Sequence, residues 1–568
     1  MIKKGTRLHA EDSDESGSFD KNSLMEQRVI VMRKNKRTAR TAALLFSVVL
    51  MLVSVTSCFK KGEDSVEYPV TEKPTYMIYY GLVDENVVEH AKQYDIVILH
   101  PNQGGLTAKQ VDAIQSTGTK VLAYLAVGED LRTSGKTPEE MREDPRFTGD
   151  GSGPRVDPRA EGDNTLENAV VSGSDSPGGS GFASYYLDDN DHDGLPDINP
   201  YFFCAYTNIG DPNWYQVLDT MTVDGEDGVA GIREILTEEY GRGLGCDGLF
   251  LDTIDTCAPN AYTDDDNPAR TRFEWTAVGV SELMARIKAD YPGTLICQNR
   301  GLFFYNHLLE HYRYNPRANV DYLFFESYRL DSNPEQLYNE GFFADNKYNL
   351  VPRLAVESRC GEGFTVLSLG YAEGPEEYDL LNTLIGKSKK GLEVLRQDVE
   401  EADELAGFSH YITNAPLTQL NDFVMINRNP EDDKAPVWSS VYNNSSEWPP
   451  HEPEARVGLG EVKSEESRCV TVTWDVALDQ TGVCYTLYYQ PEPFDFDADP
   501  DLIKAKKVLL NPTITEDYQK GVTDAYPYCA TVDAMESGKE YSFVLRATDT
   551  SPQHNEEKNT VVKTAVIQ

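Results

Sequence analysis

The chain has 568 residues, of which 52 are lysine or arginine and 94 are aspartate or glutamate, so its formal net charge is −42. Hydrophobic residues make up 40% and aromatic residues 10%, which excludes global disorder, and the length predicts two folded units, one of them large. The acidic balance argues against a nucleic-acid partner, because phosphates must be neutralised by lysine and arginine. The same charge would attract a cationic substrate, or serve solubility alone.

The first 57 residues have the pattern of an export signal and not of a folded domain. A basic segment at residues 32–37 precedes an apolar run from Ala42 to Val55, and small residues then lead to Cys58. This order is typical of a secretory signal. The apolar run has 14 residues, fewer than the roughly 20 that an uncleaved membrane-spanning helix needs.

A cysteine directly after small residues resembles the lipobox of bacterial lipoproteins. The resemblance implies a lipid on Cys58 and an exported bacterial membrane lipoprotein facing the periplasm or the cell surface, with residues 58–73 as a tether. The lipid would be its only membrane contact. Eight further cysteines follow without any Cys-x-x-Cys pair, so we expect most to be buried free thiols and not zinc ligands.

Eight apolar runs alternate with helical stretches over residues 74–428. They are continuous, as is typical of parallel strands buried on both faces. The predicted strands are Tyr76–Gly81, Tyr94–Pro101, Lys120–Val127, Cys246–Asp252, Thr294–Asn299, Val320–Ser327, Val366–Ala372 and Phe408–Asn414. Thr107 to Gln110 form a capping-box pattern, and further helices are predicted at Val229–Tyr240, Ala269–Tyr291 and Glu376–Leu405.

Eight strands with crossover helices predict an α/β protein with a (β/α)8 TIM barrel. A doubly wound sheet is the alternative, which the lack of a dinucleotide-binding glycine motif disfavours. One connection, residues 131–213, is far longer than the others and rich in glycine, serine, proline and aspartate. Such long loops are functional or hold added structure, and this insertion would lie at the carboxyl-terminal face of the barrel.

A linker and a second domain are predicted after the barrel. Residues 429–456 contain five prolines and many polar residues, as linkers do. Residues 457–568 hold short alternating runs typical of a β-sandwich. The segment Gly538–Ala547 resembles the penultimate strand of a fibronectin type III domain, with Tyr541 at the tyrosine-corner position.

Polar residues gather where the predicted barrel strands end, which is where barrels carry their catalytic side chains. They are Tyr80, His100, Glu129, Asp252, Asp255, Gln298, Asn299, Glu326, Tyr371 and Tyr411. Ion pairing inside the barrel is the alternative for the acids, Asp255 could cap the following turn, and His100 and the tyrosines could be packed rim residues. Two carboxylates that face each other across a cleft suit glycoside hydrolysis.

Four segments together resemble glycoside hydrolase family 114, the endo-α-1,4-polygalactosaminidases related to spherulin-4-like proteins. The segments are Leu122–Glu129, Cys246–Asp255, Gln298–Asn299 and Phe325–Tyr328, and the resemblance spans residues 74–428. It implies a TIM barrel that cleaves α-1,4-linked galactosamine polymers without a catalytic cofactor. Asp252 would be the nucleophile and Glu326 the general acid/base.

The predicted substrate-binding residues are Tyr80, His100, Glu129, Asp255, Gln298, Asn299 and Tyr371. The insertion departs from the smaller family members and leaves the substrate open. A cationic amino-sugar polymer would suit the acidic chain, which we expect to be a monomer. Two alternatives from other classes stay open: a non-catalytic carbohydrate-binding lipoprotein on the same barrel, and an adhesion protein in which the sandwich domain binds.

The insertion contains a possible calcium loop. Asp189, Asp191, Asp193 and Asp197 occupy positions 1, 3, 5 and 9, with Gly194 at position 6. Pro200 at position 12 excludes a complete EF-hand, and the pattern resembles thrombospondin type 3 and dockerin-like loops. Structural Ca²⁺ that orders the insertion is the prediction, and an acidic loop without metal is the alternative. Trp214, just downstream, could stack on a sugar or anchor its helix.

Overall fold

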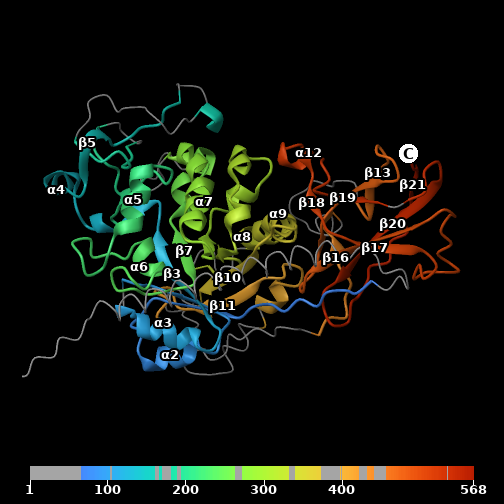
Figure 1. Cartoon of the computed structure of the whole chain (residues 1–568), viewed down its shortest axis with the longest axis horizontal. Helices are drawn as coiled ribbons and strands as arrows, with labels where there is room; N and C mark the ends of the chain where they lie inside the picture. Colours follow the sequence, from blue (N-terminus) through green and yellow to red (C-terminus); the bar gives the residue numbers. More distant parts are fainter. Residues whose placement is uncertain are drawn as a thin grey trace, which may run out of the picture. The chain divides into compact units, whose positions relative to one another are not determined.

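A parallel sheet of eight strands organises the first large part of the chain in the computed structural model (Figure 1). The structure describes residues 66–102, 105–159, 165–168, 181–188, 193–262, 272–331, 340–371, 397, 399–420, 431–440, 456–533 and 535–568. The strands are β1 (Tyr76–Tyr79), β2 (Ile96–Leu99), β3 (Lys120–Ala126), β7 (Gly248–Asp252), β8 (Leu295–Asn299), β9 (Tyr322–Glu326), β10 (Thr365–Tyr371) and β11 (Ser409–Thr413), paired in that order. All eight predicted strands are confirmed.

The first and last strands approach each other, so the sheet is nearly closed into a barrel. The amide of Tyr80 donates to the carbonyl of Leu417 at 2.7 Å, and the rings of Tyr76 and Tyr411 lie 5.6 Å apart. Tyr76 also packs edge-on against Phe324 at 5.8 Å. Large aromatic rings from several strands therefore fill the interior, as a barrel core requires.

Helices follow most strands, although two are shorter than the sequence predicts. They are α2 (Glu85–Ala91), α3 (Ala108–Gln115), α5 (Pro212–Thr220), α6 (Ile232–Leu236), α7 (Val280–Asp290), α8 (Glu340–Asp345) and α9 (Val351–Ser358). The capping box at Thr107 is confirmed. The prediction of a helix over Val229–Tyr240 was wrong in extent, because Thr237 adopts an extended backbone that ends α6.

The helix predicted over Ala269–Tyr291 is α-helical only from Val280, after a 3₁₀ segment at Glu274–Gly279. Gly279 packs directly against Gly210, where an added Cβ would meet the Cα of Gly210 at 2.2 Å. That close approach fixes the entry into α7 and leaves no room for a side chain. Most of the helix predicted over Glu376–Leu405 lies outside the described residues.

The insertion between β3 and α5 has structure of its own. It contains β4 (Glu129–Asp130), α4 (Pro138–Glu143), β5 (Thr148–Gly153) and β6 (Ala205–Tyr206), and β4 pairs with β6. Arg132 donates to both carboxylate oxygens of buried Asp130, at 2.9 and 2.8 Å. Trp214 is fully buried and donates its indole N–H to the carbonyl of Val127 at 2.7 Å, so it anchors its helix.

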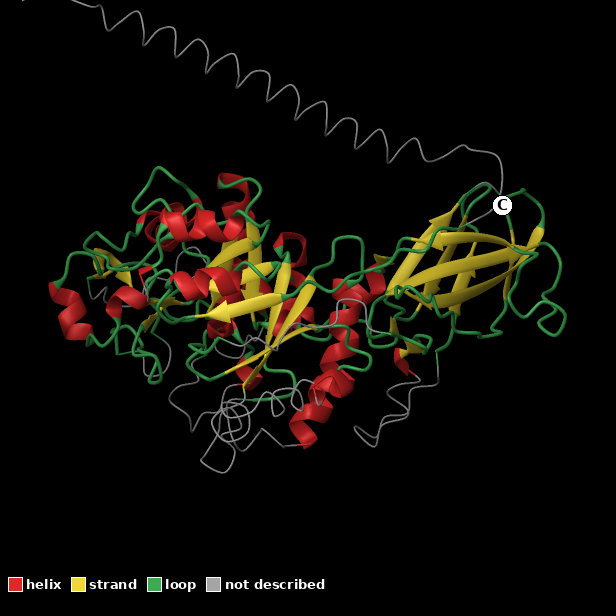
Figure 2. Cartoon of the chain, turned by 90° about the horizontal axis from the view of Figure 1, so that it is seen from below, coloured by secondary structure: helices red, strands yellow, loops and turns green. Residues whose placement is uncertain are grey.

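The C-terminal part is built from two antiparallel sheets of four strands (Figure 2). One contains β13 (Leu459–Lys463), β14 (Val470–Trp474), β19 (Tyr528–Val532) and β18 (Thr513–Ile514); the other contains β17 (Lys506–Leu510), β16 (Val483–Gln490), β20 (Glu540–Asp549) and β21 (Lys563–Val566). A two-stranded sheet joins β12 (Val437–Trp438) to β15 (Ala477–Leu478). Trp474 and Tyr528 pack against Tyr485 at 5.5 and 5.8 Å, which forms an aromatic core.

All eight cysteines of the described part are free thiols, five of them buried, in agreement with the sequence-based expectation. Among the residues whose structure is described, no helix is both long and apolar enough to cross a membrane. Cys58 and the export signal lie outside those residues.

Candidate active site

Asp252 and Glu326 end two strands, β7 and β9, that flank β8 in the sheet. Asn299 ends β8 between them, and its amide nitrogen donates to Asp252 Oδ1 at 2.7 Å and to Glu326 Oε2 at 3.0 Å. Both oxygens accept from the same nitrogen, so they lie no more than 5.7 Å apart. The structure thus brings together the two carboxylates that the sequence singled out.

Burial and a neighbouring carboxylate disfavour the charged form of Glu326. Desolvation, and next the negative charge of Asp252, raise the pKa of Glu326 above its ordinary value. Hydrogen bonds from Tyr371 and Asn299 and the charge of Arg300 oppose this shift without cancelling it. The Tyr371 hydroxyl, at the end of β10, donates to Glu326 Oε1, the oxygen that Asn299 leaves free.

An aromatic cluster lies beside Asp252. Tyr124, within β3, hydrogen-bonds to the Asp252 carboxylate, and its ring stacks on His100 at 4.6 Å and meets Tyr80 edge-on at 5.5 Å. Burial lowers the pKa of His100 to about 4, so its imidazole is neutral at pH 7. Tyr80 and His100 therefore support Tyr124, a residue that was not among the predicted site residues.

Glu129 is a third acid of this region and is buried. Its Oε1 accepts a hydrogen bond from Asn199 of the insertion at 2.6 Å, while its Oε2 has no hydrogen-bond partner in the described part of the chain. Desolvation, assisted by the charge of Asp252, raises the pKa of Glu129 to about 7 even though Asn199 opposes the shift. No sequence signal identified Asn199, which lies 70 positions further along the chain.

Asp255 shapes the loop after β8. Its Oδ2 forms an ion pair with Arg300 Nε at 2.6 Å, and its Oδ1 accepts from the amide of Gly301 at 3.1 Å. Arg300 has a positive φ of 56°, and so does Thr253, at 64°, directly after Asp252. Backbone strain of this kind is common at functional sites, and here it falls on the residues that directly follow Asn299 and Asp252.

Gln298 lies on the opposite face of β8 from Asn299, as adjacent strand residues must. It is fully buried, accepts from the Tyr305 hydroxyl at 3.0 Å and donates to the carbonyl of Arg300 at 2.8 Å. The geometry makes Gln298 a support for the Arg300 loop and gives no support to the predicted substrate contact. Tyr411 is likewise buried within the barrel.

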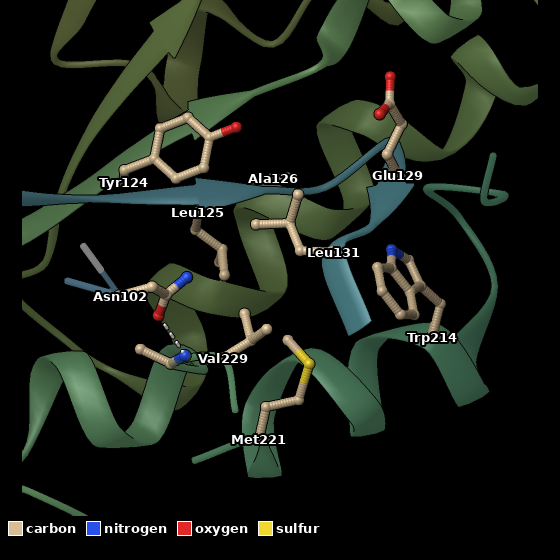
Figure 3. Close-up of a pocket in the computed structure, with 10 residues that line it drawn as sticks. Asn102, Tyr124, Leu125, Ala126, Glu129, Leu131, Trp214, Met221 and Val229 are labelled. Atoms are coloured by element: carbon tan, nitrogen blue, oxygen red, sulfur yellow. Dashed lines mark hydrogen bonds between the residues drawn. The ribbon is translucent and has the colours of Figure 1, made fainter. Parts of the chain in front are cut away.

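A small cavity lies beside β3 (Figure 3). Leu125, Met221 and Val229 lie on its side of the strand, whereas Tyr124 and Glu129 project to the other side. Asn102 closes one end, where its side chain accepts from the amide of Ala230 at 2.7 Å. Tyr124 and Glu129 also line the cavity, whereas Asp252 and Glu326 do not.

The predicted calcium loop is described only in part. Asp189 and Asp191 lie outside the described residues. Asp193 Oδ1 accepts from the amide of Leu195 at 2.8 Å, and the amide of Asp197 donates to the carbonyl of Leu187 at 2.8 Å. Calcium binding here stays a prediction.

Comparison with known proteins finds only distant structural likeness. No family model matches the chain, and no curated protein matches it. The glycoside hydrolase domain of PelA from Pseudomonas aeruginosa is similar over 61% of this chain and 96% of its own, at 15% identity and a TM-score of 0.35. An α-amylase from Geobacillus thermoleovorans is similar over 86% of this chain and 99% of its own, at 10% identity and a TM-score of 0.30. With TM-scores this low, neither likeness indicates a family or an activity for this chain.

Proposed function

We propose that this chain is a glycoside hydrolase whose two catalytic carboxylates are Asp252 and Glu326. The observation that carries the proposal is the Asn299 amide, which holds one oxygen of each carboxylate at 2.7 and 3.0 Å. Two oxygens no more than 5.7 Å apart agree with retaining enzymes, whose carboxyl groups lie about 5–5.5 Å apart, better than with the roughly 6.5–9.5 Å of inverting ones. We therefore propose retention of anomeric configuration.

The environments favour different roles for the two acids. Asp252 is held by Asn299 and Tyr124, which orients an oxygen for attack on the anomeric carbon. Glu326, with its raised pKa, is suited to protonate the departing glycosidic oxygen. In the second half-reaction the ionised Glu326 would take a proton from water, which then releases the sugar from Asp252.

A cationic amino-sugar polysaccharide suits the charge of the site and of the chain. Glu129 offers a buried carboxylate oxygen without a hydrogen-bond partner among the described residues, which an amine or hydroxyl of the sugar could satisfy. The net charge of −42 would draw a polycation toward the protein, an effect that salt weakens. Together with the resemblance to family 114, these features support α-1,4-linked polygalactosamine as the substrate.

An exposed aromatic segment of the insertion adds a candidate sugar-stacking surface. Tyr201, Phe202 and Phe203 are consecutive and 66%, 64% and 59% exposed. The amides of Tyr201 and Phe202 donate to Asn199, the residue that holds Glu129. The segment is thereby tied to the acidic region, and exposed flat rings suit the faces of sugars.

The remaining proposals concern the setting of this enzyme. We propose a lipid on Cys58 that tethers an exported monomer, a structural Ca²⁺ in the loop at residues 189–197, and a fibronectin type III-like sandwich as a spacer or weak binding surface. The sequence patterns support each of them. Two four-stranded antiparallel sheets in the C-terminal part agree with the last.

The direct test is cleavage of soluble polysaccharides by the purified protein, with acetylated and de-N-acetylated galactosamine polymers in the panel. Asp252→Asn and Glu326→Gln should abolish product formation. Asp247→Asn is the matched control, because Asp247 lies at the other end of β7 and contacts Lys120. Binding of a polymer without cleavage by the unaltered protein would instead indicate a non-catalytic carbohydrate-binding protein.

A further inference from the structure

Three buried aspartates from separate segments meet in the C-terminal part of the chain. Asp432 precedes β12, Asp479 follows β15 and Asp549 ends β20. One carboxylate oxygen of each lies within 4.8 Å of the other two, and the three residues are 2%, 2% and 0% exposed. Buried carboxylates are costly unless they are paired with a cation or coordinate a metal.

Hydrogen bonds satisfy most of the carboxylate oxygens of this cluster, but one buried oxygen lacks a partner among the described residues. Asp479 Oδ1 accepts from the amide and the hydroxyl of Thr481, both at 2.9 Å. Asp549 Oδ2 accepts from the side-chain amide of Asn555 at 2.7 Å. Asp432 Oδ1 accepts from a backbone amide, but Asp432 Oδ2 is buried and has no hydrogen-bond partner in the described part of the chain.

No lysine or arginine of the described ranges forms an ion pair with any of the three carboxylates. Arg359 lies close by, but its guanidinium donates to the backbone carbonyls of Ala477 and Asp479, at 2.8 and 3.0 Å. The three carboxylates therefore lie close together without an ion-pair partner among the described lysines and arginines.

We propose that Asp432, Asp479 and Asp549 bind one structural Ca²⁺. The donors are all oxygens, which hard cations prefer, and Ca²⁺ takes them at about 2.3–2.6 Å, so oxygens on opposite sides of one ion lie up to about 5 Å apart. The spacing of up to 4.8 Å fits that span. Mg²⁺ usually keeps several waters and is seldom enclosed by protein carboxylates alone, which favours Ca²⁺ at a buried cluster.

The ion would fasten the segment at residues 431–440 to the sandwich. That segment is already attached through β12, which pairs with β15, and through Asn555, whose amide donates to the carbonyl of Asp432 at 2.7 Å. Asp432 is the ligand contributed by this segment, whereas Asp479 and Asp549 belong to the sandwich itself. Bound Ca²⁺ should therefore stabilise the C-terminal part against unfolding.

The test measures Ca²⁺ binding and thermal unfolding of the full chain after treatment with a chelator, and it does not depend on enzymatic activity. Asp432→Asn removes one ligand, and Asp433→Asn is the matched control because its neighbouring carboxylate is exposed. Every protein is also prepared with Asp193→Asn, which weakens the separate loop predicted in the insertion. Loss of a direct ligand should weaken Ca²⁺ binding by about 100-fold or more, and the control should bind as before.

The effect of Asp432→Asn on the melting temperature should depend on whether Ca²⁺ is present. In chelator, Asp432→Asn should melt at the same temperature as the unaltered chain or higher, since one repelling charge is gone; in excess Ca²⁺ it should melt lower. A variant that merely folds poorly would melt lower in both. The proposal is overturned if the chain with Asp432 intact binds no Ca²⁺ in this background, if Asp432→Asn binds as tightly as Asp433→Asn, or if Asp432→Asn melts below the unaltered chain in chelator as well as in Ca²⁺.

Discussion

Tyr371→Phe tests whether Glu326 acts as the proton donor. The substitution removes one hydroxyl, the donor to Glu326 Oε1, and leaves the ring in place. A hydrogen bond to a charged group is worth about 1.5–3 kcal/mol, and one pKa unit corresponds to about 1.4 kcal/mol. Because this bond favours the ionised carboxylate, its loss should raise the pKa of Glu326 by about 1–2 units.

The assay is the pH dependence of kcat/KM. Glu326 must be protonated to act, so activity falls as pH rises through its pKa, and in Tyr371→Phe this alkaline limb should move upward by about 1–2 pH units. Tyr411→Phe is the control, since it removes a hydroxyl from a tyrosine buried in the neighbouring strand β11. An alkaline limb that stays in place, or moves to lower pH, would refute the assignment of Glu326 as the acid.

Three further predictions concern Asn299, Trp214 and the exposed aromatic segment of the insertion. Asn299→Ala removes the donor shared by both carboxylates and should lower kcat by about 10²–10³-fold; a loss below tenfold would contradict that role. Trp214→Ala should lower the free energy of unfolding by about 3–5 kcal/mol in denaturant titration, because the indole is fully buried; an unchanged value would exclude the anchor. Tyr201→Ala with Phe202→Ala should raise KM for long polymers and spare kcat, and an unchanged KM would remove this segment from the binding surface.

The barrel could be predicted because buried parallel strands leave continuous apolar runs in the sequence. Barrels carry their catalytic side chains where the strands end, so the polar residues Asp252, Asn299 and Glu326 at the ends of these runs marked the site. The two residues that end β8 are both polar, and only the pleat of the strand decides that Asn299 faces the carboxylates while Gln298 faces away. Tyr124 was missed for the same reason. In a continuous apolar run, the sequence does not show which residues point to which face of the strand.

Contacts between distant segments left no signal in the sequence. Asn199 meets Glu129 across 70 positions through the fold of the insertion. The acids Asp432, Asp479 and Asp549 have no common spacing, because the pairing of β12 with β15 and the end of β20 bring them together. Helix ends were also overextended, since the extended backbone at Thr237 and the Gly279–Gly210 contact depend on tertiary packing.

The measurement that tests the central claim most directly is the configuration of the first product, followed by proton NMR during hydrolysis of an α-linked galactosamine oligomer. Two carboxylates bridged by one amide nitrogen should give a newly formed reducing end that is α before mutarotation, as retention requires. The signal should be missing with Asp252→Asn. A first product of β configuration would contradict the separation inferred from Asn299 and assign the attack to water.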